Sequence, residues 1–355
     1  MALLPEPRLQ HLDDQTGLTV FQYDKMAPRR QFCDVVVVKA RFALTPDGIS
    51  RSAQSAELCL ADTPRNADDP LGSSLAQAGD LIVGKPGADI YVSGMARRAQ
   101  PARYWGVSVT LGPQARPLAH YACAATGPRH WRHSLLSGWQ LSETEPTQAV
   151  PIEYELSYGG GKPDPKKPAD EWERFETNPS GSGFHLDHYT RDQTPAGPQW
   201  ESASVFASLK SRDLVGLGPV ARFWASRKQY IGTYDQAWER EQLKDGVIAD
   251  YPPDFDLRFL HCAHPKLQTT APLKGDEALY LEGLLQTMAP LRTRLPGLTV
   301  LAALGTALAQ GHQQVRLPLD TVHLDLNENE VKLVWRLTLP HSLNIERVHL
   351  SLGSV

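Results

Sequence analysis

Two pairs of histidines are the residues whose type and spacing could most readily support chemistry. His185 and His188 enclose Asp187, and His261 and His264 enclose a cysteine and an alanine. Imidazole is a common ligand of zinc, and two such clusters could combine around one or two ions in a hydrolase. Neither pair lies on an obvious helix that would align residues three apart, and this spacing arises by chance among 12 histidines. We therefore expect surface or packed histidines and no required metal or cofactor, with a metal-dependent hydrolase as the alternative.

Motifs for nucleophilic or phosphate chemistry are missing from the sequence. Ser182 lies in a glycine turn, without the strand before it and the helix after it that a nucleophile elbow needs. The segment 159–162 places glycines beside a lysine, but its spacing is not that of a Walker loop. Asp254 and Asp256 could act as an acid and base pair, but the adjoining prolines favour a rigid turn whose carboxylates accept backbone hydrogen bonds. The sequence thus predicts no catalytic residue, and a protein that is not an enzyme.

The aromatic residues of one long irregular segment are better candidates for function. The segment 162–204 contains six prolines and few apolar residues, and a loop of this length is usually functional or disordered. Trp172 and Trp200 occur there in polar surroundings, and Phe175 lies between them. Aromatic side chains on an adaptable loop are typical of protein interfaces. We therefore expect Trp172, Phe175 and Trp200 to contact a partner protein.

The elements that must position these residues are expected to be mostly strands. Glycine and proline, with 27 and 28 residues, are spread along the chain. Turn signals recur about every ten to fifteen residues and separate runs of alternating β-branched residues. These patterns predict a mainly β fold, with a β-sandwich or barrel-like antiparallel sheets, a few short helices and long loops. The expected strands are two short ones within 81–94 and single ones at 17–24, 32–45, 103–111, 117–124, 152–158, 320–326, 331–339 and 344–351.

One helix is predicted clearly, and one further stretch is ambiguous. Thr233 and Gln236 have capping-box spacing, and Asp235 complements the helix dipole in the first turn, so a helix should run from Thr233 to about residue 245. The apolar stretch 298–310 is rich in alanine, but Gly305 weakens a helix, so the stretch could also begin as a strand.

Length and charge bound the organisation of the chain. The 355 residues suit one unit, or two packed lobes at 1–161 and 205–355 joined by the irregular segment 162–204. A net charge of −4 is too balanced to imply nucleic acid or an anionic membrane as partner. The start of the chain has no signal-peptide pattern, no stretch approaches a membrane span, and the four cysteines form no CxxC pair. We expect a cytoplasmic protein without membrane insertion.

Seven short segments of the chain resemble, in the same order, the motifs of a bacterial family known as domain of unknown function 2169. The segments lie at 85–96, 127–131, 151–160, 178–184, 232–238, 251–256 and 273–277. Ser182 and Pro128 depart from the pattern, which has an arginine and an acidic residue there. The residues that match the family motifs are Lys85, Asp89, Gly94, Arg129, Trp131, Tyr158, Gly159, Gly160, Asn178, Pro179, Gly181, Gly183, Phe184, Gly232, Thr233, Tyr234, Asp235, Trp238, Asp254, Asp256, Gly275 and Glu277.

The resemblance implies a function that involves binding, not catalysis. Members of the family are typically encoded beside type VI secretion genes of Gram-negative bacteria. The resemblance implies an adaptor or chaperone that holds a type VI secretion effector, or its PAAR-containing carrier, and helps to load it on the spike protein. The motif residues are interpreted as structural. We expect positive φ angles at Gly181 and Gly183, with Phe184 anchoring that loop on the sheet.

Overall fold

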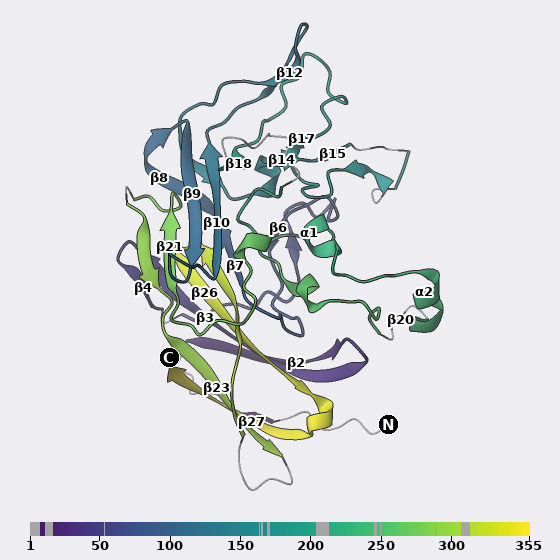
Figure 1. Ribbon diagram of the computed structural model, residues 1–355, viewed down its shortest axis with the longest axis vertical. Coiled ribbons are helices and arrows are strands. Elements are labelled where there is room, and N and C mark those ends of the chain that lie inside the picture. The colour runs from purple at the N-terminus through teal and green to yellow at the C-terminus, as the bar shows by residue number, and fades with distance from the viewer. Residues whose placement is uncertain are drawn as a thin grey trace.

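In a computed structural model, the protein consists mainly of strands (Figure 1). The structure describes residues 8–10, 17–52, 54–162, 164, 166–168, 171–203, 213–244, 247–248, 250–287, 289–306 and 313–355. Antiparallel sheets pack face to face, and short helices and long loops cover them, so the predicted mainly β, sandwich-like fold is confirmed. Within these residues, no helix is long and apolar enough to cross a membrane.

A central sheet joins the beginning and the end of the chain. All of its neighbouring strands are antiparallel except β25 and β7, which are parallel. A further strand, β4 (Gly48–Arg51), pairs with β3 outside this order. The strands in spatial order are β2 (Leu18–Ala27), β3 (Gln31–Thr45), β26 (Glu330–Pro340), β25 (Leu319–Asp325) and β7 (Asp89–Ser93).

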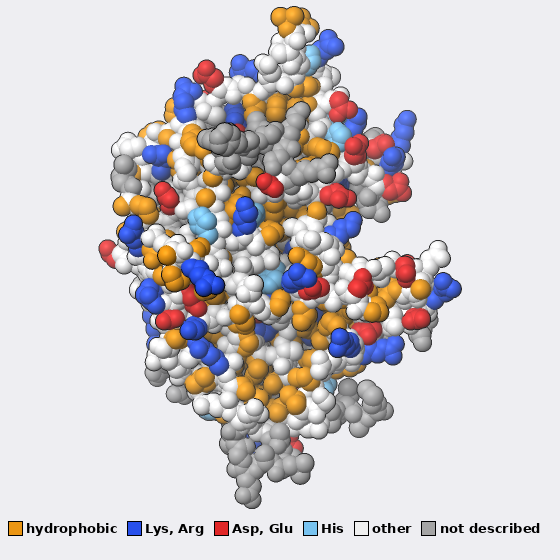
Figure 2. Space-filling model, in the orientation of Figure 1, with side chains coloured by type: hydrophobic (Ala, Val, Ile, Leu, Met, Phe, Trp, Pro, Cys, Tyr) orange, Lys and Arg blue, Asp and Glu red, His pale blue; other side chains and the backbone are white. Residues whose placement is uncertain are grey.

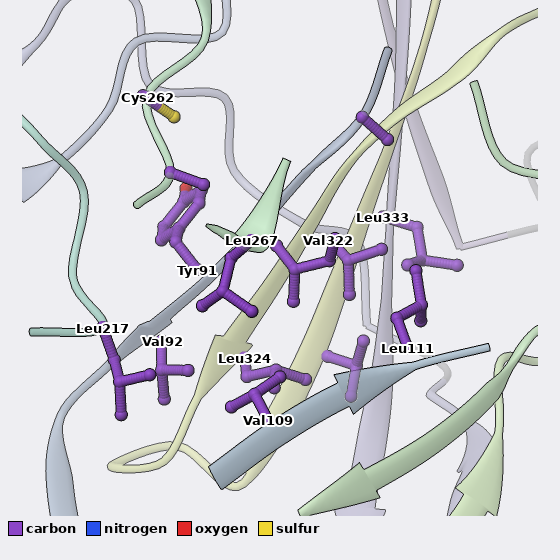
Figure 3. Packing of buried hydrophobic residues seen from close by; sticks show 14 of the residues in the cluster. Tyr91, Val92, Val109, Leu111, Leu217, Cys262, Leu267, Val322, Leu324 and Leu333 are labelled. Carbon is purple, nitrogen blue, oxygen red and sulfur yellow. The ribbon is translucent and has the colours of Figure 1, made fainter. Parts of the chain in front are cut away.

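A second sheet packs on one face of the central sheet. Val109 of this second sheet points toward Leu324 of the central sheet, and Leu111 lies beside Leu333 (Figure 3). We call the face of the central sheet that meets the second sheet the inner face, and the opposite one the outer face. The second sheet has the order β18 (Trp200–Ser202), β10 (Ala119–Thr126), β9 (Tyr104–Leu111), β21 (Ala278–Glu282) and β22 (Leu291–Arg294).

A third sheet resolves the ambiguous stretch near the C-terminal end. Leu298–Thr306 forms the strand β23, so the stretch 298–310 is a strand as far as residue 306, and its last residues lie outside the described part of the chain. The sheet has the order β1 (Arg8–Gln10), β27 (Ile345–Ser354), β23 and β24 (Gln313–Arg316).

Short strand pairs and helical turns make up the remaining elements. The pairs are β5 (Thr63–Pro64) with β6 (Leu75–Gln77), β8 (Met95–Ala102) with β13 (Thr147–Pro151), β11 (Trp131–Ser134) with β12 (Gly138–Leu141), β14 (Tyr158–Gly159) with β17 (Ser182–Gly183), β15 (Gly161–Lys162) with β16 (Glu173–Arg174) and β19 (Leu243–Lys244) with β20 (Val247–Ile248). The helices are α1 (Ala225–Lys228) and α2 (Gln236–Gln242), and 3-10 turns include Tyr154–Leu156, Leu257–Leu260, Pro265–Leu267 and His341–Leu343.

Three local predictions are wrong. The stretch 81–94 holds one strand, β7, where two were expected, because residues 81–88 form bends and irregular backbone. The stretch 152–158 is a 3-10 turn at Tyr154–Leu156 followed by the short strand β14, although its residues alternate. The helix begins at Gln236, later than expected, because the Asp235 carboxylate accepts the hydrogen bond from the backbone of Trp238. Thr233 does not cap this helix and donates instead to Asp254.

The segments expected as possible lobes share their sheets. β3 from the first segment pairs with β26 from the last, and β9 pairs with β21. Each of these two sheets therefore draws strands from both 1–161 and 205–355, and one large apolar core extends through all of them.

Candidate functional site

The outer face of the central sheet carries charged side chains that are buried under loops. Lys39 on β3 is 2% exposed, and its ammonium lies 2.7 Å from the carboxylate of Asp80. Arg336 on β26 is 3% exposed, pairs with Asp320 and donates to the backbone carbonyl of Asp80. A buried charge is stable only when it is paired and hydrogen-bonded. These pairs therefore fix the loop around Asp80 on the sheet.

The motif residues Lys85 and Asp89 form the centre of this charged layer. The Asp89 carboxylate lies 2.7 Å from Lys85 Nζ and 2.7 Å from His261 Nδ1, and it accepts from the backbone of Cys262 at 2.8 Å. Burial alone would favour the neutral acid, but the Lys85 ammonium and His261 hold the pKa of Asp89 well below its ordinary value. Lys85 also donates to Thr321 on β25 at 2.7 Å. The cluster joins β7, β25 and the 261–262 loop.

The four histidines of the metal alternative lie in two different environments. His261 is 2% exposed and bound to Asp89, while His264 is 4% exposed and stacks on Tyr121 with ring centroids 3.9 Å apart. Burial lowers the pKa of His264 to about 4, which keeps its ring neutral near pH 7. His185 is half-buried near Glu173, and His188 is exposed. Across the described residues, the group of three potential metal ligands within reach of one another contains none of these four histidines.

An arm of residues 229–257 projects from the body beside the central sheet and carries α2 (Figure 1). Its base is held by Arg227, which is 3% exposed. The Arg227 guanidinium donates to the carbonyl of Val220 at 2.7 Å and to the carbonyl of Phe259 at 2.9 Å. One side chain therefore ties together the two chain segments that flank the arm.

Motif residues also shape the outer part of the arm. The Asp254 carboxylate accepts from the backbone and the hydroxyl of Thr233, at 2.9 and 2.8 Å. The ring of Tyr234 meets the ring of Trp238 edge to face, with centroids 4.5 Å apart. Lys and Arg side chains alternate with Asp and Glu on the surface of the arm (Figure 2). Because the arm has few other elements to pack on, these local bonds define its shape.

A groove of about 1330 Å³ lies between the arm and the central sheet. Its outer end is bridged at the β2–β3 turn, where the backbone of Arg30 donates to Asp250 and its side chain donates to Gln242, both at 3.1 Å. Apolar and aromatic side chains from the arm make up much of one wall. The lining residues are Ala27 to Gln31, Val83 to Lys85, Thr233, Asp235, Ala237, Trp238, Glu241, Gln242, Asp250 to Phe255, Leu257, Pro318, Asp320 and Arg336 to Thr338.

Another set of motif residues closes the base of the irregular segment. Asn178 is 1% exposed, and its side-chain amide donates to the carbonyls of Tyr154 and Tyr158. Gly183 has a φ of 103°, but Gly181 does not have a positive φ, so that expectation is correct only for Gly183. A side chain at Gly181 would still meet the carbonyl oxygen of Ser157 at 2.5 Å. Close backbone approach explains this second glycine.

The expected partner-binding aromatics do not share one exposed surface. Trp200 is 2% exposed and donates to the carbonyl of Pro151 at 2.7 Å, so the expectation of a surface contact at Trp200 is wrong. Trp172 and Phe175 are half-buried. Trp172 lies under the guanidinium of Arg174, and Phe175 packs on Tyr158 and on Phe184. The polar neighbours of Trp200 in sequence point away from its ring, which occupies the core.

The remaining motif residues make specific local contacts. Arg129 is 9% exposed, donates to the carbonyl of Pro198 and pairs with Glu201. The other contacts are those of Trp131 (6% exposed, against Gly183), Gly94 (φ 97°, close to Asn327), Gly159 and Gly160 (positive φ, close to Asn178 and Gly181), Pro179 (buried after Asn178), Gly232 (φ 86°, close to Asp254), Asp256 (accepting from the backbone of Arg258), Gly275 (φ 105°) and Glu277 (accepting from the backbone of Lys274 and Gly275).

The sequence analysis missed two features, an exposed apolar hairpin tip and the buried charges of the central sheet. Leu135 and Leu136, at the tip of the β11–β12 hairpin, are 87% and 100% exposed, and this tip is apolar in Figure 2. Lys39 directly follows the valine run of β3, and Arg336 lies between Trp335 and Leu337 on β26. A charge inside such an apolar run is a usable signal, because it must either face solvent or meet a buried partner.

Comparison with known proteins identifies one family. A family model described as an uncharacterized protein conserved in bacteria (DUF2169) matches residues 29–336. The match includes the second sheet, the arm and most of the central sheet, but β2 and the end of β26 lie outside it. No curated protein and no solved structure matches the chain.

Proposed function

Because the chain belongs to the bacterial family called domain of unknown function 2169, we propose that it is a non-catalytic adaptor or chaperone for a type VI secretion effector or for its PAAR-containing carrier. In this proposal the protein holds its client in the cytoplasm of a Gram-negative bacterium until the client is loaded on the spike. The client binds non-covalently, and no nucleic acid or membrane takes part.

The groove between the arm and the central sheet is the observation that supports this proposal best. Its volume of about 1330 Å³ exceeds the roughly 300–1,000 Å³ of small-molecule pockets, so it suits a segment of polypeptide. The carboxylates of Asp235, Asp250 and Asp254 already accept hydrogen bonds from the protein itself. The wall thus offers mainly the apolar surfaces of residues such as Trp238 and Leu257. We infer that the occupant is an apolar segment of the client.

The alternative of a metal-dependent hydrolase has no comparable support. None of His185, His188, His261 and His264 belongs to the lining of the groove. His261 and His264 are buried and are engaged with Asp89 and with the carbonyl of Leu214. Binding to these nitrogens would require the protein to give up contacts that hold its loops.

Co-expression with the product of the neighbouring gene tests the proposal. We expect the protein to co-elute with that effector or PAAR-containing carrier as a stable complex in size-exclusion chromatography. Deletion of the gene should abolish delivery of the same effector, and a plasmid-borne copy should restore it. Separate elution of the two proteins, together with intact effector delivery in the deletion strain, would contradict the adaptor function.

A further inference from the structure

Three potential metal ligands meet at the end of the central sheet, away from the groove. Asp24 on β2 and Asp34 on β3 are directly opposite each other in the antiparallel ladder. His341 follows β26 in a 3-10 turn, and its Nε2 atom lies 3.4 Å from Asp24 Oδ1 and 3.4 Å from Asp34 Oδ2. One ligand atom from each residue lies within 4.8 Å of the others.

These separations match the edges of a small tetrahedral coordination shell. Zinc binds imidazole nitrogen and carboxylate oxygen at about 2.0–2.2 Å. Two ligands of a tetrahedron are about 1.6 bond lengths apart, which gives roughly 3.3–3.6 Å for such bonds. The two distances of 3.4 Å fall in this range, and they are longer than good hydrogen bonds. The distances from His341 to the two carboxylates therefore suit ligands of one ion better than direct hydrogen bonds.

The electrostatics of the cluster also favour a cation. Like charges directly opposite in a sheet are destabilising, and Asp34 is only 7% exposed. Among the described residues, the ion pairs of Asp24 and Asp34 involve His341, which is a cation only when protonated. The other carboxylate oxygen of Asp34 accepts from Gln22 Nε2 at 3.2 Å. Such an outer hydrogen bond is typical of carboxylates that bind metals, because it fixes the direction of the free oxygen.

We propose that Asp24, Asp34 and His341 bind a divalent transition metal ion of the zinc class, with a fourth position open to water or to a ligand from a partner. One imidazole with two carboxylates suits zinc, cobalt or nickel better than calcium or magnesium, which prefer oxygen ligands alone. The sequence led us to expect no required metal, so this proposal departs from that expectation. The proposed site uses none of the histidines that the sequence singled out.

The site is independent of the groove and of the adaptor function. Strand alternation places Asp34 on the same face of β3 as Val36, which belongs to the inner face. The groove is lined from the outer face, by Arg336 and Thr338. A bound ion would cross-link the β2–β3 ladder to the turn at His341–Leu343, so the ion should raise the melting temperature without changing client binding.

Zinc titration of tag-free protein, after removal of metals with a chelator, tests the site. We expect one zinc ion per chain by calorimetry. Asp24→Asn, Asp34→Asn and His341→Gln should each weaken zinc binding by at least about tenfold. The control variants His188→Gln and His349→Gln, which change exposed histidines elsewhere, should bind zinc like the wild type. Unchanged binding in the three site variants, or loss of binding in His188→Gln, would overturn the proposal.

Cobalt provides a second measurement that does not depend on the stability of the variants. Tetrahedral cobalt absorbs visible light much more strongly than six-coordinate cobalt, so the wild type should give an intense spectrum that zinc abolishes. His341→Gln, which changes a partly exposed residue, should lose this spectrum while keeping its fold. A folded wild type that takes up no cobalt, or only weakly absorbing cobalt, would show that these residues are not a tetrahedral site.

Discussion

The two faces of the central sheet differ in chemistry although they belong to the same strands. The inner face presents residues such as Val36 and Val322, which pack against the second sheet (Figure 3). The outer face presents Lys39, which meets the carboxylate of Asp80 in a covering loop, and Arg336, which donates to the backbone carbonyl of Asp80 in the same loop. Apolar contact is non-directional, whereas each ion pair requires one partner in one place. The difference indicates that the inner face supplies cohesion and the outer face determines where the loops and the arm lie.

The energetics of the two faces should differ in the same way. Burial of apolar surface contributes about 25 cal/mol per Å² and tolerates changes of shape. A buried ion pair adds little net stability, but removal of one partner leaves an uncompensated charge at a cost of about 3–5 kcal/mol. The effects of two substitutions in one ion pair of the outer face should therefore not be additive. The effects of two substitutions on the inner face should be additive.

The largest effect is expected from Asp89→Asn, which keeps the shape of the side chain and removes its charge. Lys85 would remain buried without a counter-charge, so the free energy of unfolding should fall by about 3–5 kcal/mol. Urea denaturation of this variant and of the Lys85→Met/Asp89→Asn double variant measures the coupling. The double variant should be the more stable of the two. If the losses of unfolding free energy from Lys85→Met and Asp89→Asn simply add in the double variant, the two residues are not coupled. That result would contradict the proposed difference between the outer and inner faces.

A smaller effect is expected from acid, through His264. Burial holds the pKa of His264 at about 4 in the folded protein, against about 6.5 in an unfolded chain. Between these values the unfolded chain binds the extra proton, so the stability that is present above pH 6.5 is lost as the pH falls toward 4. From pH 7 to pH 5 the loss through this residue should be about 2 kcal/mol. Urea denaturation at both pH values should show a smaller loss for His264→Gln, and an equal loss would contradict the assignment.

The smallest effect is expected in the loop that neither face of the sheet controls. Alanine at Gly183 combines a positive φ with an approach of 2.7 Å to the ring of Trp131, so it should cost at least about 1 kcal/mol. Alanine at Gly181 should cost a similar amount through contact with the carbonyl of Ser157. Gly106→Ala is the matched control, because that position has open space. Thermal denaturation in which all three variants resemble the wild type would show that the loop tolerates side chains.

The sequence predicted the strands with clear alternation better than it predicted the site. The ladders of β3, β9 and β26 follow from alternating β-branched residues within one segment. The stretch 152–158 has the same alternation but is a 3-10 turn, because tertiary contacts around Tyr154 outweigh local propensity. Trp200 was expected on the surface because its neighbours are polar, although its own ring is buried.

The groove and the charged layer could not be predicted because they combine distant residues. Arg30 meets Asp250 and Gln242 across more than 200 positions, and Lys85 meets Thr321 across a similar separation. No local pattern encodes such pairs. The motif at 232–238 indicated the helix, but not that the helix forms a wall of a groove.

The most direct test of the account is the affinity of the purified client for variants of the groove. Leu257→Arg places a charge in the groove at a position that is 39% exposed, so folding should be retained. Leu118→Arg makes the same change at an exposed position outside the groove, and Trp172→Ala removes the aromatic residue expected from sequence. We predict that Leu257→Arg weakens binding by at least about tenfold, or about 1.4 kcal/mol, while the other two variants bind like the wild type. Unchanged binding of Leu257→Arg, with loss of binding in Trp172→Ala, would contradict the groove and place the interface on the irregular segment.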